Sequence, residues 1–131
     1  LILSIEISEI EFKMRCAKGD RERILFMLSE LSHRETRARS LGSQKTVVGI
    51  LLIRARALLY LEQTEGARSA IIEATCLSIL NGMRLRRISS LILMAALMGL
   101  RGQKDSAIAL LASLRMLSTQ IRYIRAVIAI D

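Results

Sequence analysis

The sequence has no proline and no tryptophan, and its aromatic residues are two phenylalanines and two tyrosines. Without proline, no residue in the chain strictly forbids a long continuous helix. The near absence of aromatic side chains argues against nucleic-acid recognition by stacking on bases. The abundant residues are Ala, Leu, Ile, Met, Arg and Ser. This composition favours helices that pack on helices, so we predict an all-α fold.

The residues that usually carry chemistry are also scarce. His33 is the single histidine, and the two cysteines, Cys16 and Cys76, form no CxxC pair. No set of metal ligands is therefore predicted. No serine has the histidine and acid partners of a nucleophile, and no GxxxxGK[ST] phosphate loop occurs. We expect a non-catalytic protein without cofactors, and we interpret the cysteines as buried thiols in the reducing cytoplasm.

Long hydrophobic runs and a signal peptide are missing as well. The longest uncharged apolar run covers 91–100, whereas a membrane-spanning helix needs about 20 residues. The mean hydropathy of +0.38 is therefore interpreted as a buried central helix. The net charge of +8 permits nucleic acid or an acidic protein surface as a partner. Leu1 and Asp131 at the two ends suggest that the chain is a fragment of a longer protein.

Hydrophobic periodicity predicts six helices and a C-terminal stub. Asp20, Thr64 and Asp105 are predicted helix N-caps, and Asn81-Gly82 is predicted to end a helix. The predicted helices cover 3–17, 21–39, 44–63, 66–80, 84–101 and 105–119, and the stub covers 121–131.

Two parts of the sequence are similar to each other. Ala57 and Ala70 stand 13 residues apart on either side of a turn, and Ala96 and Ala109 repeat that spacing. Small residues on facing helices allow close packing, a device also found in tetratricopeptide repeats. We therefore predict one domain over 1–131, a right-handed stack of about three helical hairpins of 39–42 residues each. An ordinary six-helix bundle is the alternative.

The repeated region resembles the helical sensor region of MalT-type LuxR transcriptional regulators. The segments that carry the resemblance are "CAKGDRERILFMLSEL" (16–31), "ATCLSILNGMRLRR" (74–87) and "TQIRYIRAVIAID" (119–131). In that family a cytoplasmic superhelix, placed between an ATPase and a DNA-binding domain, senses an inducer or an inhibitory protein. The resemblance implies a sensor or interaction module, with ATP and DNA bound only by other domains.

Clustered charges supply the candidate binding residues. Arg84, Arg86 and Arg87 open a predicted helix, where positive charge opposes the helix dipole, so a use in binding an acidic partner or anionic effector is suggested. Arg54 and Glu62 share a helix face that could form part of a concave groove, and Arg101 would lie on the next unit. The alternative for all six residues is that they are solvated charges at the rim or wall of a repeat protein.

The sequence thus predicts a sensor or protein-interaction module that binds a protein partner or a small-molecule inducer, with self-association left open. A free-standing helical-repeat adaptor that scaffolds another protein is the first alternative. A small basic DNA-binding helical protein is the second, suggested by the charge of +8.

Overall fold

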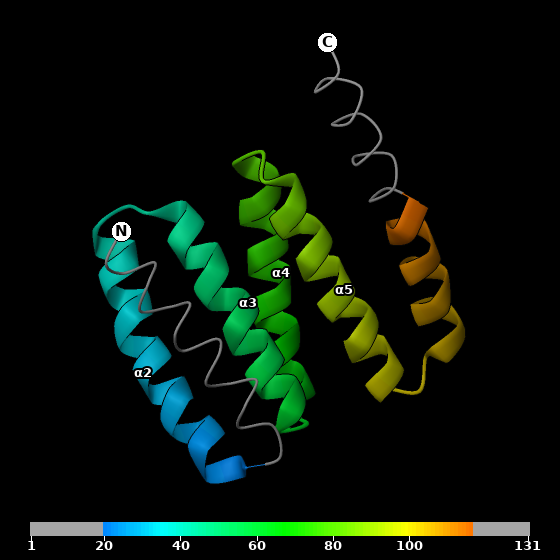
Figure 1. Ribbon diagram of the computed structural model, residues 1–131, viewed down its shortest axis with the longest axis horizontal. Coiled ribbons are helices and arrows are strands. Elements are labelled where there is room, and N and C mark those ends of the chain that lie inside the picture. Colours follow the sequence, from blue (N-terminus) through cyan, green and yellow to red (C-terminus); the bar gives the residue numbers. More distant parts are fainter. Residues whose placement is uncertain (1–19, 117–131) are drawn as a thin grey trace, which may run out of the picture.

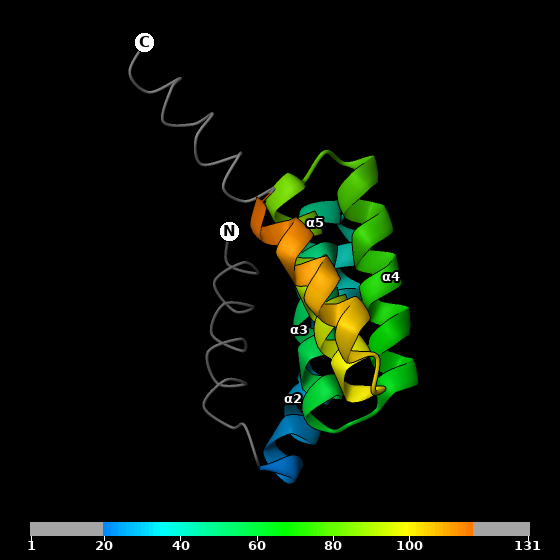
Figure 2. The ribbon, with the colours of Figure 1, turned by 90° about the vertical axis from the view of Figure 1, so that its right-hand side faces the viewer.

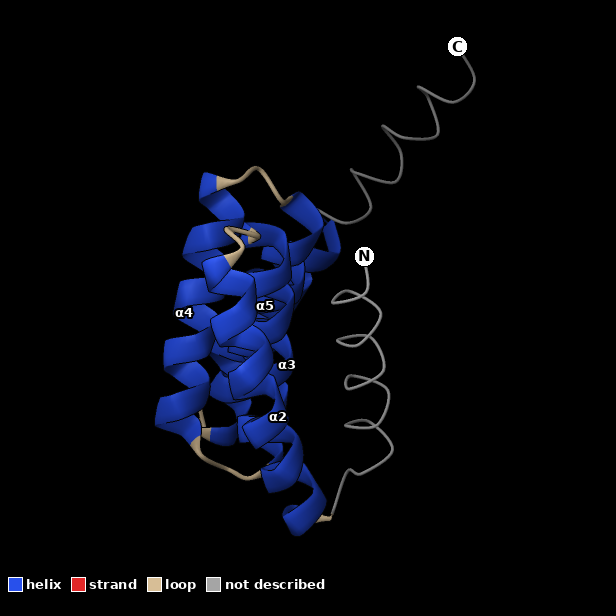
Figure 3. Cartoon of the chain, turned by 90° about the vertical axis from the view of Figure 1, so that its left-hand side faces the viewer, coloured by secondary structure: helices blue, strands red, loops and turns tan. Residues whose placement is uncertain are grey.

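The structure is a computed structural model, and it describes residues 20–116. Five consecutive, antiparallel helices make up this part of the chain (Figure 1). They are α2 (Arg21–Ser40), α3 (Gln44–Tyr60), α4 (Thr64–Leu80), α5 (Arg84–Leu100) and the helical residues 104–116. Within residues 20–116 there are only helices and short turns, as predicted for an all-α fold (Figure 3). The predicted helix 3–17 and the stub 121–131 lie outside the described residues.

The observed helix boundaries depart most from prediction between α3 and α4. The predicted helices 44–63 and 66–80 leave too short a turn, because α3 ends at Tyr60 and α4 begins at Thr64. Glu62 takes a left-handed φ of 59°, a conformation for which the sequence offers no glycine as a signal. Gln63 is the N-cap, so the prediction that Thr64 caps this helix is wrong.

The other predicted caps have different outcomes. Asp20 is confirmed as the N-cap of α2, where its side chain accepts a 3.2 Å hydrogen bond from the Arg23 amide. Asn81 is confirmed at the end of α4, followed by Gly82 with a φ of 65°. Asp105 lies inside a helix that starts at 104, so its predicted capping role is wrong.

The same turn recurs with a period of 20 residues. Its third residue donates an amide hydrogen bond to the carbonyl five residues earlier, and its second residue has a positive φ, as in a Schellman helix end. These bonds are Ser43 to Ala38 (3.1 Å), Gln63 to Leu58 (2.9 Å), Met83 to Ser78 (2.8 Å) and Gln103 to Met98 (2.9 Å). A hairpin of two helices therefore repeats every 40 residues, a value within the predicted range.

This register corrects one of the predicted alanine pairs. Ala57 and Ala70 are buried as expected, but Ala96 and Ala109 are exposed. The assumed offset of 39 residues is one short of the structural period, and one residue rotates a helical side chain by about 100°. The alanines that repeat in register, all buried, are Ala55 and Ala67 in one hairpin and Ala95 and Ala107 in the next.

The core centres on α3, which packs against α2, α4 and α5. Its side chains are buried around most of its circumference, which is typical of a helix that is apolar on nearly every face. The buried central helix is therefore α3, whereas the run 91–100 that predicted one lies in α5, where Ile92 and Leu100 are 46% and 51% exposed. Ile50 and Leu51 are at most 2% exposed, and burying each such side chain contributes about 1.5–3 kcal/mol. The helices succeed one another from α2 at one end to 104–116 at the other (Figures 1 and 2).

Two further expectations can be compared with the described residues. Cys76 is exposed on α4, so its interpretation as a buried thiol is wrong, while Cys16 lies outside the described residues. None of the helices within 20–116 is long and apolar enough to cross a membrane.

Candidate functional site

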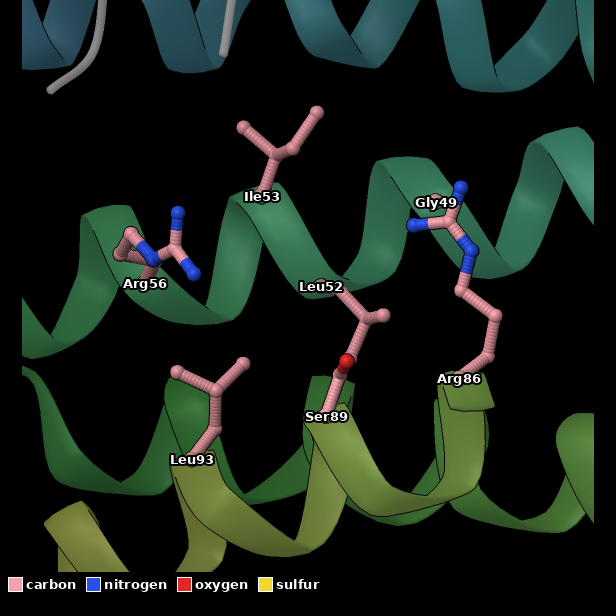
Figure 4. A pocket seen from close by; sticks show the side chains of 7 residues that line it. All are labelled: Gly49, Leu52, Ile53, Arg56, Arg86, Ser89 and Leu93. Carbon is pink, nitrogen blue, oxygen red and sulfur yellow. The ribbon is translucent and has the colours of Figure 1, made fainter. Parts of the chain in front are cut away.

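A groove runs between α3 and α5, the two helices that are related by one 40-residue period. It encloses about 120 Å³ and combines an apolar floor with two arginines (Figure 4). Its lining residues are Gly49, Leu52, Ile53, Arg56, Arg86, Ser89 and Leu93. The direct packing of α5 on α3 brings these residues together although they lie far apart in the sequence.

Arg86 crosses the groove from α5 to α3. Its guanidinium lies over Gly49, where a Cβ atom would be 3.8 Å from Nη2 (Figure 4). Glycine in the middle of a helix costs about 0.5–1 kcal/mol relative to alanine, but here it opens space beside the backbone for the arginine. Within residues 20–116, no carboxylate forms an ion pair with Arg86.

Arg56 brings a second positive charge to the same groove. It is seven residues after Gly49 on α3, which corresponds to a separation of about 10.5 Å along the helix axis at 1.5 Å per residue. Leu52 and Leu93 lie between the two arginines (Figure 4). Two positive charges that flank an apolar strip raise the local concentration of anionic ligands and suit carboxylates, the usual partners of guanidinium groups.

Ser89 is the uncharged polar residue of the groove lining. Its Oγ donates a 3.1 Å hydrogen bond to the Leu85 carbonyl within α5. The oxygen retains its lone pairs, so it can accept a further hydrogen bond from a bound amide. The groove therefore offers groups for anionic, apolar and amide parts of a ligand.

The three arginines that the sequence analysis grouped together have different environments in the structure. Arg84, Arg86 and Arg87 all lie in the first turn of α5, which contains no acidic residue. Arg86 lines the groove, Arg84 is exposed outside its lining, and Arg87 is half-buried. The Arg87 carbonyl accepts a 2.8 Å hydrogen bond from Ser90, whose Oγ in turn accepts a 2.9 Å bond from Thr75 of α4.

Arg54 takes part in a network that joins three helices. It forms an ion pair with Glu35 of α2, and both side chains are less than a quarter exposed. Arg39 contacts Glu35 at 3.4 Å and Glu73 of α4 at 2.7 Å. The hydrogen bond to Glu73 is the main cause of a raised pKa at Arg39; burial opposes the shift, and the charges of Glu73 and Glu35 add to it. Arg54 thus connects α3 to α2, away from the groove.

Glu62 and Arg101 lie at two other places. Glu62 lines a small hollow with Arg21, Ile24, Tyr60 and Leu61. Arg101 pairs with Glu65 and lines a second cavity, between α4 and α5, that also contains Arg68 and Met98. The six predicted residues are therefore not gathered into one site, and of these six only Arg86 lines the α3–α5 groove.

Sequence reasoning missed Gly49, Arg56 and Ser89 as members of the site. A signal was present at Gly49, because an isolated glycine inside an apolar helix often marks a close approach by another group. Arg56 interrupts the same apolar helix one turn before its end. Neither residue could be assigned to a groove without knowing which face of α5 packs on α3.

The described part of the chain offers no metal centre. No group of three His, Cys, Asp or Glu residues within 20–116 could hold a metal ion, and His33 is exposed. No protein-family model, curated protein or solved structure matches this chain.

Proposed function

We propose that this protein is a non-catalytic, helical-repeat interaction module that binds an acidic segment of a partner protein in the α3–α5 groove. The observation that carries the proposal is the placement of the Arg86 guanidinium over Gly49, on the same groove as Arg56. A small-molecule inducer that carries carboxylates is the alternative ligand.

The repeat architecture supports an interaction role. The 40-residue hairpin period and the contact between α3 and α5 are consistent with a right-handed, tetratricopeptide-like stack, in which the first helices of successive hairpins share one face. Such stacks use that shared face as an extended binding surface. The groove lies on the two first helices, α3 and α5.

The spacing of the two arginines suggests the form of the ligand. A peptide in the polyproline II conformation has three residues per turn and rises about 3.1 Å per residue, so carboxylates three positions apart point to the same side and lie about 9 Å apart. This is close to the separation of about 10.5 Å estimated along α3. An acidic–apolar–apolar–acidic segment would place its carboxylates at Arg86 and Arg56 and its apolar residues near Leu52 and Leu93.

A labelled peptide tests the proposal. Fluorescence anisotropy would compare a fluorescein-labelled peptide containing Glu-Leu-Leu-Glu with one containing Gln-Leu-Leu-Gln. Because a hydrogen bond to a charged group contributes about 1.5–3 kcal/mol, Arg86→Glu should weaken binding of the acidic peptide at least about tenfold. Arg84→Glu is the matched control, because it makes the same charge change two residues before Arg86, at a residue outside the groove lining.

Two results would count against the groove. One is equal binding of the acidic and amide peptides to the unmodified protein. The other is an equal loss of affinity in Arg84→Glu and Arg86→Glu, which would indicate attraction to the net charge of +8 and not to a defined site.

The larger context proposed here is a cytoplasmic, signal-responsive transcriptional regulator of the MalT type. Its support is the sequence resemblance of the hairpins, and a free-standing adaptor is the alternative context for the same groove. The reading frame that encodes the chain distinguishes them, since a regulator would also encode a phosphate-binding loop and a DNA-binding helix-turn-helix.

A further inference from the structure

Large apolar side chains are exposed at one end of the helix stack. Because successive helices are antiparallel, the last residues of α2, of α4 and of the helix 104–116 lie at this same end (Figure 1). Leu80, the last residue of α4, is 80% exposed, and Leu41, which caps the end of α2, is 66% exposed. Ile79 and Leu85 lie on either side of the turn between α4 and α5, and both are more than half exposed.

The same end carries positive charge. None of residues 36–48, 76–88 and 112–116 is Asp or Glu, and we call the surface that these residues form the basic end. Arg39 is neutralised there by Glu35 and Glu73, which lie further along α2 and α4. The other basic residues of this end are Arg37, Lys45, Arg84, Arg86, Arg87 and Arg115.

The opposite end of the stack carries charges of both signs. Its acidic residues include Asp20, Glu22, Glu62, Glu65 and Asp105. The two ends are separated by the length of α2, which has 20 residues and is therefore about 30 Å long. This length is several times the Debye length of about 8 Å at physiological salt, so each end presents its own charge to an approaching partner.

Apolar side chains within a basic surface suit an anionic membrane surface. Anionic headgroups attract Lys and Arg within a Debye length, and apolar side chains enter the boundary between headgroups and acyl chains. A fluid lipid surface accommodates Leu41 and Leu80 at the ends of two separate helices, whereas a folded partner would need a matching pocket for each. Nucleic acid would attract the arginines but would leave the leucines in water.

We infer that the basic end docks on an anionic lipid surface, with Leu41 and Leu80 inserted among the headgroups. The exposed basic residues that contact the lipid phosphates and carboxylates are Arg37, Lys45 and Arg84. None of these five residues lines the α3–α5 groove, so the lipid contact is distinct from the proposed peptide site.

Vesicle co-sedimentation with the full chain tests the charge part of this inference. Vesicles with equal parts of phosphatidylcholine and phosphatidylserine should bind the protein at least about tenfold more tightly than vesicles of phosphatidylcholine alone. Arg84→Glu should weaken binding to the anionic vesicles at least about tenfold, because it replaces an attraction by a repulsion. Arg21→Glu is the control, since it makes the same charge change at the first residue of α2, at the opposite end, and should change affinity less than about twofold.

A second pair of variants tests the insertion of the leucines. Leu80→Gln should weaken binding to the anionic vesicles at least about fivefold, because less apolar surface then leaves water. Leu100→Gln is the matched control, because Leu100 is the last residue of α5 and lies at the opposite end. Both leucines are more than half exposed, so both variants should fold, which far-ultraviolet circular dichroism checks.

Three results would overturn the inference. The first is equal binding to the two kinds of vesicle, or binding to neither. The second is an equal loss of affinity in either variant and its control, which would indicate attraction to the whole molecule and not to the basic end. The third is a lower Kd for duplex DNA or for polyglutamate than for the anionic vesicles, unchanged in Leu80→Gln, which would assign the basic end to nucleic acid or to an acidic protein.

Discussion

The guanidinium of Arg86 on α5 lies over Gly49 on α3, in the space that a side chain at position 49 would occupy (Figure 4). A Cβ added at Gly49 would meet Nη2 at 3.8 Å, which is ordinary van der Waals contact. A methyl group therefore fits beside the guanidinium, whereas a longer side chain would occupy its place.

Substitutions at Gly49 separate stability from binding. Gly49→Ala should raise the free energy of unfolding by about 0.5–1 kcal/mol, because alanine restricts the unfolded chain and the site has room for a methyl group. Gly49→Leu should displace Arg86 and weaken binding of the acidic peptide. Urea melts and peptide titrations of the two variants check this, and unchanged affinity in Gly49→Leu would contradict the placement of Arg86.

Glu62 is a non-glycine residue in a left-handed conformation, with a φ of 59°. The equivalent residues of the other three turns are Gly42, Gly82 and Gly102. Glu62→Gly should therefore stabilise the protein by about 1 kcal/mol, since a side chain in this region costs about 1–2 kcal/mol. Thermal unfolding measures the change, with Glu65→Gly in the first turn of α4 as a control that should destabilise. A lower melting temperature for Glu62→Gly would disprove the turn geometry.

The 40-residue register predicts opposite outcomes for two nearby alanines. Ala107 is buried at 7% exposure, so Ala107→Leu should overpack its contact and destabilise by about 1–3 kcal/mol. Ala109 is exposed, so Ala109→Leu should change stability by less than about 0.5 kcal/mol. Urea denaturation of both variants tests the register. If Ala109→Leu were the more destabilising variant, the result would favour an offset of 39 residues over one of 40.

The ion pair between Glu35 and Arg54 should couple α2 to α3. Because both side chains are less than a quarter exposed, a double-mutant cycle with Glu35→Gln and Arg54→Met should give a coupling free energy of about 1 kcal/mol. A cycle on Glu65 and Arg101 provides the comparison, since Glu65 is 80% exposed and its pair should couple more weakly. Equal coupling in the two cycles would contradict a structural role for Arg54.

Much of the fold could be predicted because helical periodicity and glycine turns depend on residues that are close together in the sequence. The signals for Asp20, Gly82 and the predicted helices 21–39 and 84–101 act within one or two helical turns, and these two helices match α2 and α5 to within one residue. The Glu62 turn was placed wrongly because its left-handed residue lacks the usual glycine. The second alanine pair, Ala96 and Ala109, was wrongly expected to be buried because the assumed offset of 39 residues is one short of the structural period.

The candidate site was harder to predict, because it depends on contacts between helices. Arg84, Arg86 and Arg87 are equivalent as a sequence pattern, but the rotation of α5 on α3 directs only Arg86 into the groove. Arg54 and Arg56 are similarly close in sequence, yet one pairs with Glu35 of α2 and the other lines the groove. Two residues along a helix rotate a side chain by about 200°, so neighbouring arginines serve different surfaces.

Charge reversal at Arg86 tests the central claim most directly. The Kd should be measured by fluorescence anisotropy for the unmodified protein and for Arg86→Glu. Each protein is titrated against two labelled peptides, one containing Glu-Leu-Leu-Glu and one containing Lys-Leu-Leu-Glu. Relative to the unmodified protein, we expect the variant to bind the first peptide about tenfold more weakly, because two negative charges then face each other. We expect it to bind the second peptide about tenfold more tightly, because the lysine of that peptide then faces a glutamate. If Arg86→Glu binds both peptides as the unmodified protein does, the α3–α5 groove is not the binding site.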